Sequence, residues 1–149
     1  MDPTLWTIRA SLIFYFPGLR SRLAWTAGCL LYLAHVAAAF HFHHDWSHAA
    51  AYRATARQTA QTLGVDWGGG LWFNYAFTVA WCADALWWWI APASRARRPR
   101  WLAAALHAFL AFMWLNGAVV FASGFVRWLA IGGALLLATL FIRRTRRPR

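Results

Sequence analysis

The chain contains the apolar run LAWTAGCLLYLAHVAAAFHF at residues 23–42, which leads directly into HHDWSH at residues 43–48. The run carries only two ionisable side chains, His35 and His41. About 20 apolar residues are enough for a helix to cross a hydrocarbon core about 30 Å thick. This stretch therefore predicts a transmembrane helix that ends in a cluster of imidazoles and one carboxylate.

Three further apolar runs of similar length follow, at residues 71–91, 101–122 and 125–142. The composition agrees with them, because 61% of the residues are hydrophobic and only 13% are charged, a balance that soluble domains rarely show. We therefore expect an all-α integral membrane protein. Its four transmembrane helices form an antiparallel bundle, and residues 1–149 make a single membrane domain.

The segments outside the four predicted spans are expected to be helical in part. Residues 3–16 predict a short helix that is stopped by Pro17 and lies at the inner interface. Residues 43–70 form the outward-facing loop, and much of this loop has high helix propensity. Two alternatives stay open for residues 45–63, which either continue the first span out of the membrane or break from it and lie on the surface.

The charge is strongly basic, at +11, and is carried entirely by arginine on the positive side. Short loops rich in arginine face the cytoplasm, and topology therefore explains the charge better than nucleic-acid binding does. The chain is expected in the inner cell membrane with both termini cytoplasmic. The arginines behind this assignment precede the first span (Arg9, Arg20, Arg22), join the second to the third (Arg95, Arg97, Arg98, Arg100) and follow the fourth (Arg143, Arg144, Arg146, Arg147, Arg149).

The histidine cluster is the first candidate site. On a continuous helix, His41, His44 and His48 are three and four residues apart and share one face, with Asp45 on its edge. Imidazoles at this spacing can bind zinc, copper or iron, and a carboxylate can orient a ring N–H. The leading hypothesis is a collar at the outer interface that binds a transition metal or haem. Membrane desaturases also use histidine boxes, but six histidines in the whole chain are too few for their diiron site.

A second candidate lies inside the predicted membrane. Asp84 and His107 fall at nearly the same depth on spans that a short link joins, so we expect them to pair. Ionisable residues within a membrane are functional hypotheses by default. The pair suggests a small oligomeric transporter or proton-coupled protein, and its structural alternative is a polar contact that fixes the register of two helices.

Four more side chains complete the predicted polar track between the two sites. They are uncharged or weakly basic and lie within or near the spans, where they are expected to line an outward-open cavity: His35, Asn74, Thr78 and Asn116.

The alternative to a metal collar is a non-catalytic scaffold or accessory subunit of a larger membrane complex. No complete set of catalytic residues is visible, so enzymatic activity is left open. The expected partners are the lipid bilayer and either other proteins or further copies of the chain, but no nucleic acid. Cys29 and Cys82 fall within predicted spans and are interpreted as small buried apolar residues.

Overall fold

The structure is a computed structural model that describes residues 3–117. These residues form helices joined by short turns, without strands in the described range. The chain divides into two compact units, Met1–Met113 and Trp114–Arg149, and the packing below is that of the first. The helices are α1 (Pro3–Gly18), α2 (Arg22–His43), α3 (His48–Leu63), α4 (Gly70–Ile90), α5 (Pro92–Ala96) and α6 (Arg100–Leu115).

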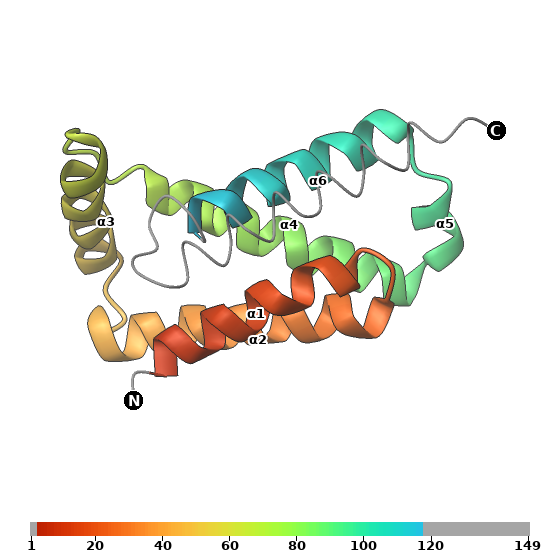
Figure 1. Cartoon of the computed structure of the whole chain (residues 1–149), viewed down its shortest axis with the longest axis horizontal. Coiled ribbons are helices and arrows are strands. Elements are labelled where there is room, and N and C mark those ends of the chain that lie inside the picture. Colours follow the sequence, from red (N-terminus) through yellow and green to blue (C-terminus); the bar gives the residue numbers. More distant parts are fainter. Residues whose placement is uncertain (1–2, 118–149) are drawn as a thin grey trace, which may run out of the picture. The chain divides into compact units, whose positions relative to one another are not determined.

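The first two helices form a close antiparallel hairpin (Figure 1). Ser21 caps α2 by accepting a hydrogen bond from the backbone N–H of Ala24 at 3.3 Å. Further along, the buried hydroxyl of Ser11 donates to the carbonyl of Gly28 at 2.9 Å. α1 therefore packs along α2, and the expected placement of residues 3–16 at the inner interface stays a prediction. This pairing places Thr4 beside the histidine-rich end of α2, where its hydroxyl lies 3.2 Å from His43 Nε2.

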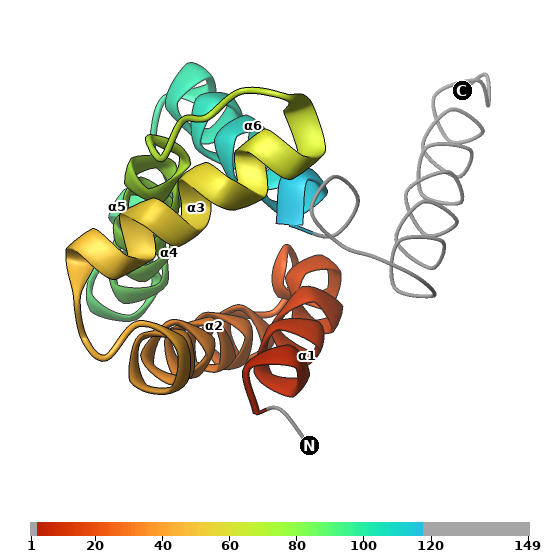
Figure 2. The same ribbon diagram turned by 90° about the vertical axis from the view of Figure 1, so that its left-hand side faces the viewer.

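The chain breaks sharply between α2 and α3. Asp45 and Trp46 both have positive φ values, 47° and 56°, and the N–H of Trp46 donates back to the carbonyl of Phe40 at 3.0 Å. Ser47 then caps α3 through the N–H of Ala50. Figure 2 shows α3 lying across the end of α2 and α4. Residues 45–63 therefore break from the first predicted span and do not continue it as one helix.

The core of the unit is a set of aromatic rings in tilted and edge-to-face contact between α1, α2 and α4. Trp25 and Trp81 are 0% and 2% exposed, and their ring centroids are 5.2 Å apart. Tyr15 lies 5.6 Å from Trp25, and Phe77 lies 5.4 Å from Trp81. The indole N–H groups of the two tryptophans have no hydrogen-bond partner in the described part of the chain. Ring contact therefore holds this core together.

The predicted spans correspond to described helices where the structure covers them. Residues 23–42 and 71–91 are α2 and α4, and the first part of 101–122 is α6. By length and hydropathy, one described helix, α2, qualifies as a membrane span, and α6 is a shorter apolar helix. The fourth predicted span, 125–142, lies outside the described residues, so the four-span bundle stays a prediction.

We expect Gly28→Leu to destabilise the helix hairpin. A Cβ atom at this position would lie 3.0 Å from Trp81 Cζ2 and 3.2 Å from Phe14 Cβ, and a buried tryptophan cannot yield easily. Overpacking of this kind costs roughly 1–3 kcal/mol. Thermal unfolding in detergent, followed by tryptophan fluorescence, measures the loss.

The matched control is Ala34→Leu, which adds the same side chain to an exposed position of α2. Equal melting temperatures for the two variants would show that α1 and α4 do not approach α2 at Gly28.

Candidate functional site

Asp84 is a buried carboxylate one and a half turns before the end of α4. Its residue is 2% exposed, although its neighbours on α4 are almost all apolar. An isolated ionised carboxylate in such surroundings would cost several kcal/mol of folding free energy. The position is therefore tolerable only if the chain supplies cationic partners.

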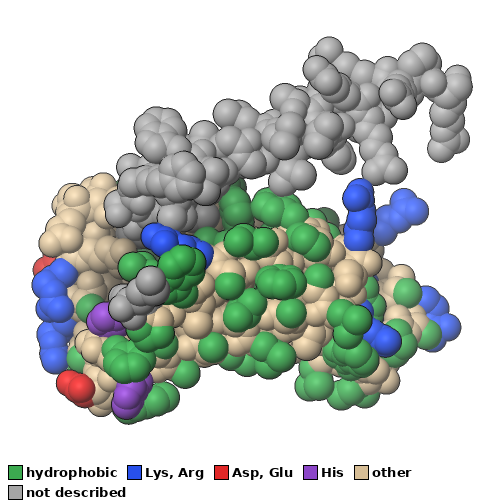
Figure 3. Space-filling view, turned by 60° about the horizontal axis from the view of Figure 1, so that its bottom comes forward, with side chains coloured by type: hydrophobic (Ala, Val, Ile, Leu, Met, Phe, Trp, Pro, Cys, Tyr) green, Lys and Arg blue, Asp and Glu red, His purple; other side chains and the backbone are tan. Residues whose placement is uncertain are grey.

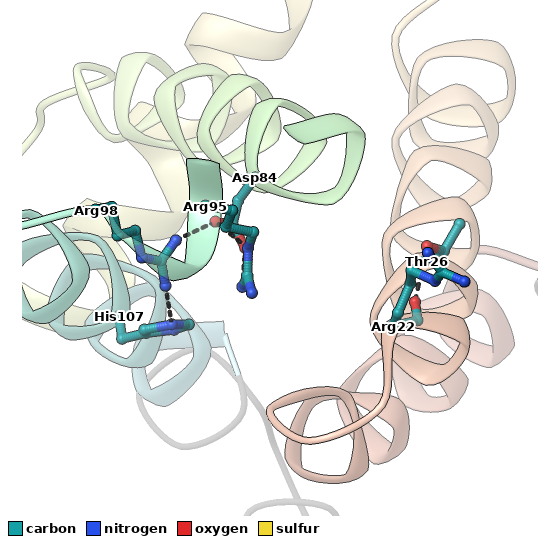
Figure 4. Close-up of polar contacts among 6 residues, drawn as sticks. All are labelled: Arg22, Thr26, Asp84, Arg95, Arg98 and His107. Carbon is teal, nitrogen blue, oxygen red and sulfur yellow. Dashed lines mark hydrogen bonds and ion pairs between the residues drawn. The ribbon is translucent and has the colours of Figure 1, made fainter. Parts of the chain in front are cut away.

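Two arginines from the α4–α6 link supply them (Figure 4). Arg95 forms a bidentate pair, in which Nε donates to Asp84 Oδ1 at 3.0 Å and Nη2 donates to Oδ2 at 2.7 Å. Arg98 Nη1 donates to Oδ1 as well. Both arginine side chains are largely covered, at 13% and 9% exposed. The planar fork of arginine suits this two-oxygen contact, which lysine cannot reproduce.

His107 joins the same cluster through Arg98. Arg98 Nη2 donates to His107 Nε2 at 3.0 Å. Because a guanidinium can only donate, the neutral imidazole accepts at Nε2 and carries its proton on Nδ1. That N–H has no hydrogen-bond partner among residues 3–117. Asp84 and His107 are thus brought together as expected, but Arg98 stands between them where a direct pair was predicted.

Sequence reasoning missed Arg95 and Arg98 because it assigned every arginine of the link to membrane topology. A signal was present. Asp84 lies six residues before Ile90, about 9 Å along the helix axis at 1.5 Å per residue. Long arginine side chains beyond Pro92 can reach back over that distance.

Two further arginine contacts tie the same end of the unit together. Arg95 lies over the ring of Trp88 at 3.8 Å, and Arg22 of α2 lies over the ring of Trp89 at 4.0 Å. The indole N–H of Trp89 donates to the hydroxyl of Thr26 at 2.8 Å. Successive tryptophans of α4 therefore hold one guanidinium from the link and one from α2.

The predicted metal collar does not assemble on one helix face. The face required a continuous helix through His41, His44, Asp45 and His48, but α2 ends at His43 and α3 begins at His48. Among residues 3–117 no group of three or more histidine, cysteine or acidic side chains is placed to hold a metal ion. The physical reason for the correction is the left-handed backbone at Asp45, which turns His48 away from the others.

The histidines instead make separate contacts with other elements. His48 Nδ1 lies 3.0 Å from the hydroxyl of Tyr75 on α4, and His41 packs against Phe42. Partial burial, and then the neighbouring His43, lower the pKa of His44. The end of α2 thus contacts α1 through His43 and Thr4, and the start of α3 contacts α4 through His48 and Tyr75.

The residues of the predicted polar track that belong to the first unit make separate contacts. His35 Nδ1 lies 2.9 Å from the carbonyl of Thr4, so its ring faces α1. Thr78 donates to the carbonyl of Asn74 within α4, and Asn74 is exposed. Asn116 belongs to the second unit.

A different opening lies between α2 and α4. It is an apolar groove of about 270 Å³, and the thiols of Cys29 and Cys82 meet on its wall with their Sγ atoms 3.5 Å apart. Both cysteines are free. The groove is lined by Thr26, Cys29, Leu30, Leu33, Cys82, Ala85, Leu86 and Trp89.

Comparison of the chain with models of protein families, with curated proteins and with solved structures finds no match. The function is therefore argued from the residues and their geometry alone.

We expect Asp84→Asn to be strongly destabilising. The amide keeps the shape of the carboxylate but removes its charge, and two largely covered guanidinium groups lose their counter-ion. Breaking a buried ion pair from one side costs roughly 3–5 kcal/mol. Thermal or denaturant unfolding in detergent checks the prediction.

Asp66→Asn provides the control, because it makes the same change at an exposed position. If both variants unfolded at the temperature of the unmodified chain, the cluster around Asp84 would contribute nothing to stability.

Proposed function

We propose that this chain is an integral membrane protein that works by binding a helix of another membrane protein, as a non-catalytic accessory subunit. The observation that carries the proposal is the apolar groove between α2 and α4, which opens on a surface already rich in exposed apolar side chains. Among residues 3–117, no group of three or more histidine, cysteine or acidic side chains is placed to hold a metal ion.

The exposed apolar surface supports lipid as the surrounding medium. Large side chains point outward from both α2 and α4, with Leu23 and Ile90 at 69% and 73% exposed and Val79 at 68%. Figure 3 shows hydrophobic side chains spread along one face of the molecule, between a left end with arginine, aspartate and histidine and a right end with arginine. Contiguous apolar surface on this scale indicates a membrane or protein interface.

Helix length supports a crossing by α4 as well as α2. Its 21 residues extend about 31 Å at 1.5 Å per residue, which matches the hydrocarbon core. Its many aromatic residues lower its hydropathy, but tryptophan and tyrosine are favourable at membrane interfaces. α2 begins and α4 ends at the same arginine-rich side of the unit, where Arg22 and Arg95 contact successive tryptophans of α4.

The size of the groove favours a protein helix over a cofactor. A volume of about 270 Å³ falls below the roughly 300–1,000 Å³ of typical small-molecule sites, and haem needs more room than that. Its lining of Leu30, Leu33, Ala85 and Leu86 suits interdigitating aliphatic side chains. In lipid, helices associate through such packing, because there is no hydrophobic driving force between them.

The two other functions have less support. The metal or haem collar requires His41, His44, Asp45 and His48 on one face, which the break after α2 separates. The small oligomeric transporter or proton-coupled protein would use Asp84 and His107, and Arg98 contacts both of these side chains.

The proposal makes a prediction about topology. Because α1 pairs antiparallel with α2, its first residues should lie on the same side of the membrane as α3, opposite the α4–α6 link. A membrane-impermeant thiol reagent should label Leu5→Cys and Gln58→Cys from one side of sealed vesicles and Ser94→Cys from the other. The three positions are exposed, and the native cysteines serve as the background control.

Labelling of Leu5→Cys together with Ser94→Cys would contradict this arrangement. It would place the beginning of α1 on the cytoplasmic side, as the arginine distribution alone predicts.

The groove can be tested with a photo-crosslinking amino acid. Placed at Leu30, which lines the groove, it should give a discrete protein adduct in native membranes. Placed at Val79, which is equally exposed but outside the groove, it should give lipid adducts alone. The mass of the adduct tells a different protein from a second copy of this chain.

Lipid adducts alone from both positions would overturn the proposed binding role, as would the same protein adduct from both.

A further inference from the structure

One end of the first unit carries many arginines and too few carboxylates to neutralise them. We call it the arginine end, and it consists of the turn between α1 and α2 and the link between α4 and α6, which lie at the same end in Figure 1. Six arginines face a single carboxylate there, Asp84, which leaves a formal excess of five positive charges. The six are Arg20, Arg22, Arg95, Arg97, Arg98 and Arg100.

The chain has no other carboxylate side chain that can reach this end. It contains four aspartates and no glutamate. Asp45 and Asp66 flank α3 at the opposite end, and Asp2 precedes α1, whose Thr4 lies beside His43. Among the described residues, Asp84 is thus the one carboxylate at the arginine end, which leaves room for an anion from outside the chain.

The geometry favours a phosphate as that anion. Arg95 and Arg98 use Nε, Nη1 and Nη2 positions on Asp84 and His107, but Arg95 Nη1 and Arg98 Nε have no hydrogen bond among the described residues. Both side chains are held in place by Asp84, and Arg95 also by the Trp88 ring. Guanidinium groups fixed in this way lose little conformational entropy when their remaining N–H groups bind phosphate oxygens.

We propose that the arginine end binds the phosphate of an anionic phospholipid, which Arg97 and Arg100 contact from the exposed side and Arg95 and Arg98 from the covered side. This inference rests on the proposed membrane location, which puts Trp88 and Trp89 at headgroup level and a phospholipid phosphate beside them. A headgroup is also anchored by its own acyl chains, so it arrives at this level at high local concentration.

The test uses the full chain purified in a neutral detergent, with melting followed by tryptophan fluorescence. Phosphatidylglycerol should raise the melting temperature by about 3–5 °C, since a ligand that binds only the folded state stabilises it. Phosphatidylcholine and inorganic phosphate at the same concentration should raise it by less than a third of that amount. Native mass spectrometry should show bound phosphatidylglycerol.

The variant Arg97→Gln with Arg100→Gln should lose at least half of the shift caused by phosphatidylglycerol. Both positions are exposed and lie outside the Asp84 cluster, so the variant should fold. The control is Arg53→Gln with Arg57→Gln, which removes the same charge from exposed positions of α3 at the other end. It should keep the full shift.

Three results would overturn the inference: equal shifts with phosphatidylglycerol and phosphatidylcholine, an equal shift with inorganic phosphate, or the same loss in both double variants. None of them bears on membrane insertion, which the labelling of vesicles decides separately. Failure to insert would remove the proposed function, whereas a missing headgroup preference would remove this inference alone.

Discussion

The buried carboxylate of Asp84 is the constraint around which the arginine-rich end is organised. A charge at 2% exposure requires cationic partners, and the bidentate contact from Arg95 with the second contact from Arg98 provides them. Because both arginines belong to the link, meeting this requirement folds the link back over the end of α4. The contact from Arg98 to His107 then brings α6 to the same place. The need to neutralise Asp84 thus determines where α4, α5 and α6 meet.

The aromatic core and the helix hairpin set the remaining arrangement of the unit. Gly28 lets Trp81 and Phe14 approach α2 closely, and the rings of Trp25 and Trp81 fill the space between the helices. Each tryptophan brings a large contact area with few rotatable bonds. Its ring contacts stabilise the core, since the indole N–H groups of Trp25 and Trp81 have no hydrogen-bond partner among the described residues. Large apolar side chains such as Leu23 and Ile90 remain exposed on the outer surface, which supports the proposed membrane location.

Much of this fold could be predicted, since helix bounds follow from the length of an apolar run. The run at 23–42 became α2 at Arg22–His43, and 71–91 became α4 at Gly70–Ile90. Lateral pairing could not be predicted in the same way. The contact between Ser11 and Gly28 joins residues whose types carry no pairing signal. The packing of α1 along α2 could therefore not be predicted from the sequence. For the site, the argument from depth considered only Asp84 and His107, and it ignored the reach of the arginine side chain that contacts both of them. The histidine face failed because a positive φ at Asp45 is uncommon for a residue other than glycine.

The joint at Asp45 and Trp46 holds two successive non-glycine residues in the left-handed region, at a cost of roughly 1–2 kcal/mol each. The contacts that α3 makes with α4, such as the one from His48 to Tyr75, must offset that cost. A straight continuation would instead form one rod of about 60 Å from Arg22 to Leu63, with its alanine-rich half projecting into water. The turn at Asp45 and Trp46 instead lays α3 across the ends of α2 and α4. A substitution that weakens the contacts between α3 and α4 would therefore favour a conformation in which Asp45 and Trp46 leave the left-handed region and α2 continues into α3.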